Sequence, residues 1–334
     1  MARFFLGVDV GGTKSHALIA DERGKAIGFG EGGSGNPQGI GYDGLHHVLR
    51  SIIQQAARSA GIAIEQIAGS GFGIGGYDWP SQREDMLSAI YPIGVRDPIG
   101  IVNDAIIGLL AGAEQGWGIA IVAGTGCNCW GWNRQHQIGR MAGFGYPVAE
   151  AAGASDIMEE AERAIAREWV LRGPATRLTT ALCDLYGMPD SGALLEAITL
   201  DRLHLQSEHA PIVFRVAAEG DAVAQGIIAW AGRELGDMAR GVIRQLQIED
   251  EAFEVVLVGS LFNGGPMLIE PLRETILSLA PRARLVRLAV PPVVGGVLLG
   301  MEQASFDFVA VRHALIESTQ AFVNGNVPQP TTSL

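Results

Sequence analysis

Cysteine is scarce in this sequence, and its scarcity narrows the classes of protein to consider. Cys127, Cys129 and Cys183 are the only three among 334 residues. An odd and sparse count argues against a disulfide framework and is typical of a reducing compartment. Cys127 and Cys129 would supply only two ligands, which do not complete a zinc site. We therefore expect the cysteines to be small buried side chains.

Long apolar runs and basic clusters are also missing. No stretch of about 18 uninterrupted apolar residues exists, so we expect no transmembrane helix. The opening "MARFFLGVDVGG" runs straight into Asp9, which indicates a strand rather than a signal peptide. The net charge is −12, and no cluster of Lys and Arg marks a nucleic-acid surface. These features predict a cytoplasmic protein with neither nucleic acid nor a membrane as partner.

Several catalytic and nucleotide-binding motifs fail or are absent. The P-loop pattern fails because Gly24-Lys25 is followed by Ala26, and no GxSxG, HExxH or EF-hand pattern occurs. "GFGIGG" (71–76) matches GxGxxG, but it lies within or at the end of an expected strand and no helix follows at once. A glycine-rich edge facing a substrate is therefore favoured over a dinucleotide fingerprint.

A strand-turn-strand pattern occurs twice. When "VDVGGTKSHALI" is laid over "IAIVAGTGCNCWGW", Gly12 matches Gly124 and Thr13 matches Thr125, 112 residues apart. Strands alternating with helices follow in both halves, with a helix-rich stretch over 150–246. The repeat predicts two similar α/β domains with mixed sheets and a cleft between them. We place them at 1–117 and 118–324, the second with a helical insertion, and expect a loose tail at 325–334.

Both repeated turns carry glycines directly after a strand. Backbone N–H groups of such turns can surround phosphate oxygens, and Thr or Lys side chains can add donors. A single turn of this kind would be read as an ordinary hairpin. Two at equivalent places favour phosphate binding, which makes these residues candidates: Gly11, Gly12, Thr13, Lys14, Gly124, Thr125 and Gly126.

The apolar stretch "GIVNDAIIGLLAG" (100–112) contains the polar pair Asn103 and Asp104. Asp104 falls where a buried strand ends and a helix begins, a place where Asp is a favoured N-cap. The carboxyl ends of strands are also where open α/β sheets bind ligands. There a carboxylate can accept the proton of a hydroxyl that attacks a phosphate. Capping and catalysis both remain open for Asp104.

Taken in order, five stretches resemble the motifs of the sugar-kinase, heat-shock-ATPase and actin superfamily. They are "VDVGGTKS" (8–15), "IVNDAIIGLLAG" (101–112), "IVAGTGCN" (121–128), "VVLVGSLF" (255–262) and "PPVVGGVLLG" (291–300). Within that superfamily the chain is similar to the N-acetylglucosamine kinase group, related to the BadF/BadG/BcrA/BcrD ATPase family. The resemblance implies two ribonuclease H-like (actin-like ATPase) domains, ATP and Mg²⁺ as cofactors, and a small-molecule sugar as substrate.

The resemblance also implies roles for single residues. Asp9 would hold Mg²⁺, Thr13 and Thr125 would contact the ATP phosphates, and Asp104 would be the general base. Gly259 and Ser260 would lie beside the adenosine, with Gly220 nearby.

The implied sugar contacts come from other segments. They are Asn36 in "GSGNPQ", Gly76 in the turn before Tyr77 and Asp78, and the pair Asn103 and Asp104.

One region departs from the family pattern. In "GFGYPVAEAAGAS", Gly143-Phe144-Gly145 fits a Gly-Trp-Gly turn with Phe in place of Trp, and Glu150 stands where a sugar-gripping Asp is expected. Ala151-Ala152-Gly153 replaces Glu-Gly-Ser, so fewer hydrogen bonds to sugar hydroxyls are expected. A different amino sugar, a plain hexose or another polyol is then an alternative to N-acetylglucosamine. Glu150 could instead be a first-turn acid of the following helix.

Two other functions compete with an ATP-dependent sugar kinase. An ATP-hydrolysing activator of a dehydratase or reductase shares this fold but needs cysteines that bridge an iron–sulfur cluster across a dimer. A non-catalytic ATP- or sugar-binding regulator would fit the altered loop, although Asp9 and Asp104 argue for catalysis. A homodimer is expected from the resemblance and from general prevalence.

Overall fold

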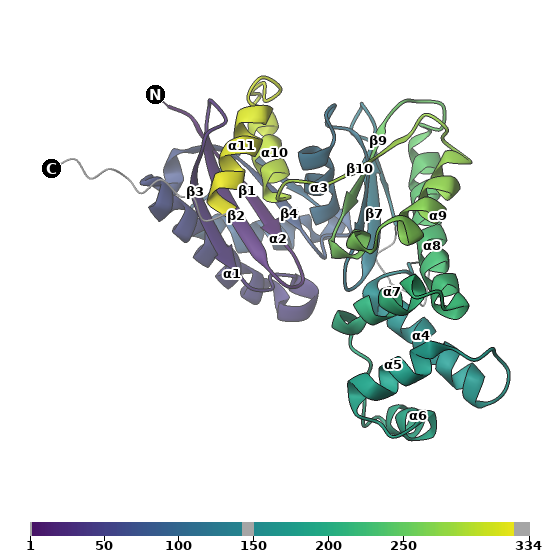
Figure 1. Ribbon diagram of the computed structural model, residues 1–334. Coiled ribbons are helices and arrows are strands. Elements are labelled where there is room, and N and C mark those ends of the chain that lie inside the picture. Colours follow the sequence, from purple (N-terminus) through teal and green to yellow (C-terminus); the bar gives the residue numbers. More distant parts are fainter. Residues whose placement is uncertain (1, 142–149, 324–334) are drawn as a thin grey trace.

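The computed structural model describes residues 2–141 and 150–323, which form two five-stranded sheets (Figure 1). The first sheet has the order β3-β2-β1-β4-β5 and the second β10-β9-β6-β7-β8. The strands of the first are β1 (Phe4–Val10), β2 (Ser15–Asp21), β3 (Ala26–Gly32), β4 (Ile67–Ile74) and β5 (Ile99–Val102). Those of the second are β6 (Gly118–Ala123), β7 (Cys127–Trp132), β8 (Ile138–Arg140), β9 (Glu254–Val258) and β10 (Arg284–Arg287).

The two sheets share one topology. In the first, β1 pairs antiparallel with β2 and parallel with β4, and β4 pairs parallel with β5. In the second, β6 pairs antiparallel with β7 and parallel with β9, and β9 pairs parallel with β10. The repeat read from the sequence, with mixed sheets in both halves, is therefore confirmed.

Helices cover both sheets and form a separate lobe beside the second (Figure 1). The helices are α1 (Pro37–Ala60), α2 (Arg83–Ile90), α3 (Asp104–Gly112), α4 (Ala154–Trp169), α5 (Arg177–Tyr186), α6 (Ser191–Thr199), α7 (Pro211–Ala218), α8 (Ala222–Leu246), α9 (Pro266–Leu277), α10 (Val293–Gln303) and α11 (Arg312–Val323). Short 3₁₀ turns span Ile64–Gln66, Pro80–Gln82, Tyr91–Ile93, Ser207–His209 and Ser260–Gly264. The lobe is built from α4 to α7, which confirms the helix-rich stretch.

Two helices cross between the halves. α3 follows the first sheet in the sequence but packs against β6, β7 and β9, whereas α10 follows the second sheet but packs against β1 and β4. The two helices also contact each other. The two helices that cross from one half to the other therefore lie side by side.

Glycines allow this close packing. A Cβ atom added at Gly71 would lie 2.2 Å from the carbonyl oxygen of Gly296 in α10, and one at Gly73 would lie 2.3 Å from Ile107 in α3. The expectation that the whole "GFGIGG" run faces a substrate is therefore wrong, because these glycines lie beneath helices. The turn at its end differs, because a Cβ atom added at Gly75 would lie 3.2 Å from the Asp104 carboxylate.

Neither β8 nor α11 was expected from the sequence. α11 packs against β3 and α10, where Leu315 joins the apolar core around Phe5 and Leu18. The segment after residue 292, assigned from the sequence to the second domain, thus packs on the first sheet. The boundary at 117/118 stays a prediction. In the part of the chain described, no helix is long and apolar enough to cross a membrane.

Candidate active site

The turn between β1 and β2 opens the first side of the cleft. The N–H of Gly11 donates to the carbonyl of Lys14 at 3.0 Å, which closes the turn. Gly12, Thr13 and Lys14 are exposed at its tip. The tip therefore presents backbone N–H groups, a hydroxyl and an ammonium group to the space between the sheets.

The turn between β6 and β7 is its counterpart on the second side. Gly124 N–H donates to the carbonyl of Gly126 at 2.9 Å. The first amides of α4 bond to this turn, since Ala154 N–H donates to Gly124 and Ser155 N–H donates to Thr125, at 2.8 and 3.0 Å. The start of α4 is thereby fixed to the second glycine turn.

The glycines at these turns are not required by the fold itself. A Cβ atom added at Gly12, Gly124 or Gly126 would meet no atom within 4 Å, and none of the three has a positive φ. A side chain would fit both the backbone and the surrounding space. The space that glycine leaves open is what a closely approaching phosphate group would fill.

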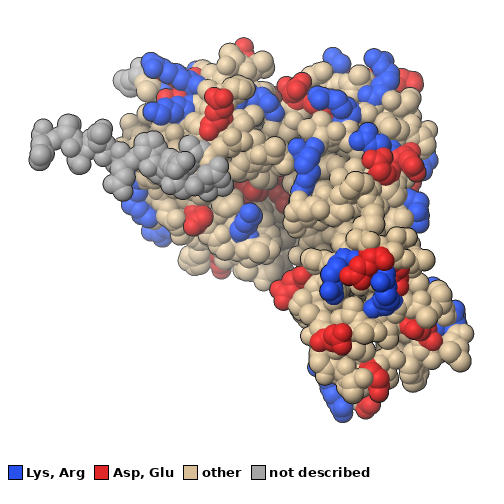
Figure 2. All heavy atoms as spheres, viewed as in Figure 1, with Lys and Arg blue, Asp and Glu red and all other residues tan. Residues whose placement is uncertain are grey.

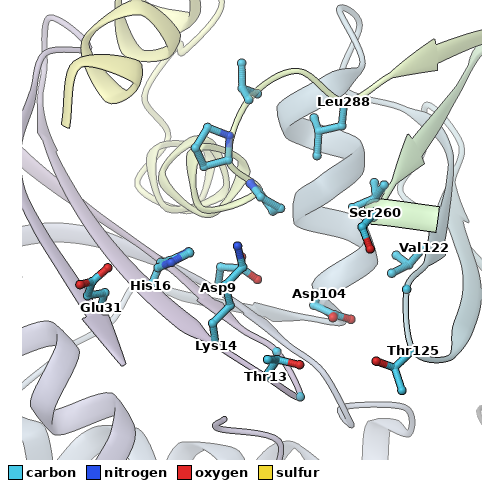
Figure 3. A pocket seen from close by; sticks show the side chains of 18 of the residues that line it. Asp9, Thr13, Lys14, His16, Glu31, Asp104, Val122, Thr125, Ser260 and Leu288 are labelled. Carbon is cyan, nitrogen blue, oxygen red and sulfur yellow. The ribbon is translucent and has the colours of Figure 1, made fainter. Parts of the chain in front are cut away.

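Both turns line one cleft of about 1140 Å³ between the halves (Figures 2 and 3). Asp9, Thr13 and Lys14 reach it from the first sheet, Thr125 and Ser260 reach it from the second half, and Asp104 lies between them at the start of α3 (Figure 3). The structure therefore brings together these predicted residues: Asp9, Gly11, Gly12, Thr13, Lys14, Asp104, Gly124, Thr125, Gly126, Gly259 and Ser260.

Asn103, rather than Asp104, caps α3. The Asn103 side-chain oxygen accepts from Ala105 N–H at 3.0 Å, and its backbone is extended. Asp104 is the first helical residue, and its half-buried carboxyl group faces the cleft. The interpretation of Asp104 as the cap is therefore wrong.

The Asp9 and Asp104 carboxyl groups are both half-buried, and their burial shifts their pKa values. Burial raises the pKa of Asp9 to about 7, with the charge of Asp104 raising it further and that of Lys14 lowering it. Burial likewise raises the pKa of Asp104 to about 6. The charge of Asp104 disfavours ionisation of Asp9, and a cation bound beside them would relieve that repulsion.

A second chamber of about 500 Å³ continues from the cleft and shares Gly124, Thr125 and Ser260 with it. Its walls combine apolar residues such as Phe214 of α7 with polar ones such as Glu208 and Asn263. A Cβ atom added at Gly264 would lie 2.1 Å from the Phe214 ring, so glycine is needed there for the ring to pack. Sequence reasoning missed this chamber.

Gly220 does not line either cavity. It lies in the turn between α7 and α8, where Asp221 caps α8 and also accepts from the hydroxyl of Thr176 at 3.0 Å. The segment "AEGD" (218–221) therefore has a clear structural role at the start of α8.

The predicted sugar contacts Asn36, Gly76 and Asn103 do not line this cleft but lie near one another. Asn36 caps α1 by accepting from Gln38 N–H at 2.9 Å, and a Cβ atom at Gly76 would lie 2.4 Å from the Asn36 side-chain oxygen. Asp78 is buried and accepts from Asn103 Nδ2 at 3.1 Å. Asn36, Gly76 and Asn103 thus belong to one neighbourhood.

Glu150 is buried, with 3% of its surface exposed. It precedes Gly153, the N-cap of α4, so it is not a first-turn acid of that helix; Asp156 is, and its carboxylate accepts from the N–H groups of Ala152 and Gly153. The predicted contacts Gly143, Phe144 and Gly145 lie outside the described residues.

The cysteines are free thiols, and Cys129 and Cys183 are buried. Burial raises the pKa of the Cys127 thiol to about 12. Among residues 2–141 and 150–323, no group of three or more His, Cys, Asp or Glu could hold a metal ion by itself.

Two sheets of one topology, two crossed helices and a cleft with a glycine turn on each side define the actin-like ATPase fold of the sugar kinases. Residues 6–300 match the BadF/BadG/BcrA/BcrD ATPase family, and the chain belongs to it.

Curated relatives span almost the same length. The chain is 23% identical to the N-acetylmuramic acid/N-acetylglucosamine kinase of Clostridium acetobutylicum, over 90% of this chain and 99% of that one. It is 24% identical to the N-acetyl-D-glucosamine kinase of Dictyostelium discoideum, over 89% and 97%. A provisionally named N-acetylglucosamine kinase from Chromobacterium violaceum has a similar structure, with a TM-score of 0.65 at 22% identity over 89% and 98%.

Proposed function

We propose that this chain is an ATP-dependent kinase that transfers the γ-phosphate to a hydroxyl of an amino sugar such as N-acetylglucosamine, or of a related hexose. The observation that carries the proposal is the position of Asp104 in one cleft between two glycine turns, with Thr13 on one and Thr125 on the other (Figure 3). The names of the curated relatives support a sugar as acceptor.

The nucleotide lies along the second half of the cleft in this proposal. Its phosphates lie between the two turns, where N–H groups and the Thr13 and Thr125 hydroxyls donate to phosphate oxygens. The base and ribose of ATP enter the second chamber, beside Gly259 and Ser260, and pack near Phe214. Gly220 has no contact with the nucleotide in this arrangement.

Asp104 acts as the general base. With a pKa of about 6 its carboxyl group is ionised at neutral pH, yet it is basic enough to accept a proton from a sugar hydroxyl. The hydroxyl oxygen then attacks the γ-phosphate in line with the leaving ADP. Because Asn103 caps the helix, Asp104 is not needed for that role.

The residues around Asp9 fit Mg²⁺. This ion is usually held by one or two carboxylates together with substrate phosphates and water, so a full set of protein ligands is not required. Asp9 would hold it, as the family resemblance implies, and the ion would neutralise the charge of the phosphates. Burial and the charge of Asp104 raise the pKa of Asp9, and a bound cation would oppose both by favouring the ionised carboxylate.

In this proposal the sugar binds near Asn36, Gly76 and Glu150. Asp104 lies between the sugar and the ATP phosphates. The family resemblance also implies sugar contacts for Gly143, Phe144 and Gly145, which lie outside the described residues. Glu150 is one methylene longer than Asp, and Ala151 and Ala152 offer no side-chain hydrogen bonds. We therefore expect a preference among sugars that differs from that of an N-acetylglucosamine kinase with the usual loop.

ADP release with Mg-ATP across a panel of amino sugars and hexoses tests the function. We expect sugar-dependent turnover that Asp104→Asn abolishes and that the matched control Asp85→Asn, in an exposed residue of α2, retains. ATP binding without turnover on any sugar would argue for a regulator instead. We also propose a cytoplasmic homodimer, which light scattering of the purified protein tests for its oligomeric state.

A further inference from the structure

A buried carboxylate joins three segments around the proposed sugar pocket. Asp78 lies in the turn after β4, and only 6% of its surface is exposed. One of its oxygens accepts from Gln38 Nε2 at 2.9 Å, and the other accepts from Asn103 Nδ2 at 3.1 Å. Its own N–H donates to the Gln82 side chain at 2.9 Å.

Each end of this bridge is attached to a residue of the proposed site. Gln38 N–H donates to Asn36, the cap of α1, and the Gln38 side chain packs against Gly76. Asn103 caps α3 and directly precedes Asp104. The position of Asp78 therefore sets how the starts of α1 and α3 lie relative to each other.

Asn103 uses its polar atoms within the protein. Its oxygen accepts from Ala105 N–H at 3.0 Å, and its Nδ2 donates to Asp78 and to the carbonyl of Tyr77, at 3.1 and 3.4 Å. A direct contact between Asn103 and the sugar would have to replace one of these bonds. The bonds of the Asn103 amide therefore fit a role in holding Asp104 in place better than a direct contact with the sugar.

We propose that Asp78 is a positioning residue that holds Asn36 and Asp104 at the separation that the sugar requires, through the bridge Gln38–Asp78–Asn103. This inference rests on the proposed function. Two acceptor oxygens suit the bridge, because both partners present NH₂ groups. Asn103 cannot reverse its amide without losing the cap, whereas Gln38 can.

This difference gives a discriminating pair of variants. In Asp78→Asn, the remaining oxygen can still accept from Asn103, and the new NH₂ can donate to a reversed Gln38 amide. In Asp78→Ala both bonds are lost. A role in positioning therefore predicts that Asn rescues what Ala destroys, while a role of the negative charge predicts equal loss in both.

The test measures steady-state kinetics of the full chain with the preferred sugar of the panel. We expect Asp78→Ala to lower kcat/KM for the sugar about 10- to 100-fold, since small misplacements of reacting groups have effects of this size. KM for ATP should change by less than about 3-fold, and Asp78→Asn and the control Asp85→Ala should stay within about 3-fold of wild type. Equal loss in the Ala and Asn variants, or unchanged sugar kinetics in Asp78→Ala, would overturn the proposal.

Hydrogen exchange measured by mass spectrometry tests the bridge without turnover. In Asp78→Ala, amides at the starts of α1 and α3 should exchange faster, while those of the two glycine turns should not change. Unchanged exchange at both helix starts would refute the bridge even if no sugar is phosphorylated. Failure of wild-type turnover on every sugar would instead refute the proposed function, so the two failures are distinguishable.

Discussion

Replacing Asp9 with Asn should stabilise the metal-free protein while abolishing its activity. The pKa of Asp9 is raised from 3.8 to about 7 because its carboxyl group is buried and lies near Asp104. The folded protein therefore binds a proton that the unfolded chain releases between about pH 4 and 7, and its stability falls as the pH rises through that window. The pKa of Asp9 differs by about three units between the folded protein and the unfolded chain. This difference lowers the free energy of unfolding by about 4 kcal/mol at neutral pH and above.

That figure is an upper bound, because Asp9 is half-buried and faces the solvent of the cleft. We expect Asp9→Asn to raise the free energy of unfolding by about 1–4 kcal/mol at about pH 8, and by much less at about pH 5. Urea unfolding with a chelator present measures both values, with Asp85→Asn as control. A gain of equal size at both pH values, or no gain at pH 8, would refute the electrostatic reasoning.

Three further predictions concern the catalytic base, a strained residue and a glycine turn. Because burial raises the pKa of Asp104 to about 6, kcat/KM should fall about tenfold per pH unit below about pH 6 and level off above it, and a flat pH–rate profile would contradict this. Ala152 has a φ of 102°, which favours glycine, so Ala152→Gly should raise the free energy of unfolding by about 1 kcal/mol in urea titrations; an unchanged midpoint would count against strain. Gly124→Val should leave the melting temperature unchanged, since open space surrounds that position, but raise KM for ATP at least about tenfold; an unchanged KM would argue against a phosphate there.

The repeat was predictable because its signal is local. A strand, a glycine turn and a second strand leave a pattern of apolar residues and turn residues within about 12 positions, and both copies fold as expected. Thr13 and Thr125 were selected as candidates for the same reason, since each lies in a recognisable turn, and Asp104 lies two residues after β5. The role of Asp9, which lies within β1, was implied only by the family resemblance.

Features that depend on distant segments were not predictable. Leu315 is buried only because α11 returns to the first sheet, and its own sequence gives no sign of that contact. The chamber around Phe214 forms where α7 meets Gly264, which lies 50 residues away. The bridge through Asp78 likewise joins residues 38, 78 and 103, and no local pattern links them.

The residue that caps α3 could not be identified from the sequence for a different reason. Asn and Asp are both favoured N-caps, and adjacent residues cannot be separated by propensity alone. The backbone conformation identifies Asn103 as the cap. Asn103 is extended and its side-chain oxygen accepts from Ala105 N–H, whereas Asp104 is already part of the helix. The observed arrangement leaves the Asp104 carboxyl group facing the cleft.

Single-turnover transfer of the γ-phosphate from ATP to the preferred sugar tests most directly whether Asp104 is the general base. Rapid quenching of wild type, Asp104→Asn and the control Asp85→Asn gives the rate of the chemical step with both substrates bound. We predict that Asp104→Asn slows transfer by about 10²- to 10⁴-fold, with little change in ATP or sugar binding and no change in the control. Transfer by Asp104→Asn within a few-fold of wild type would contradict the account.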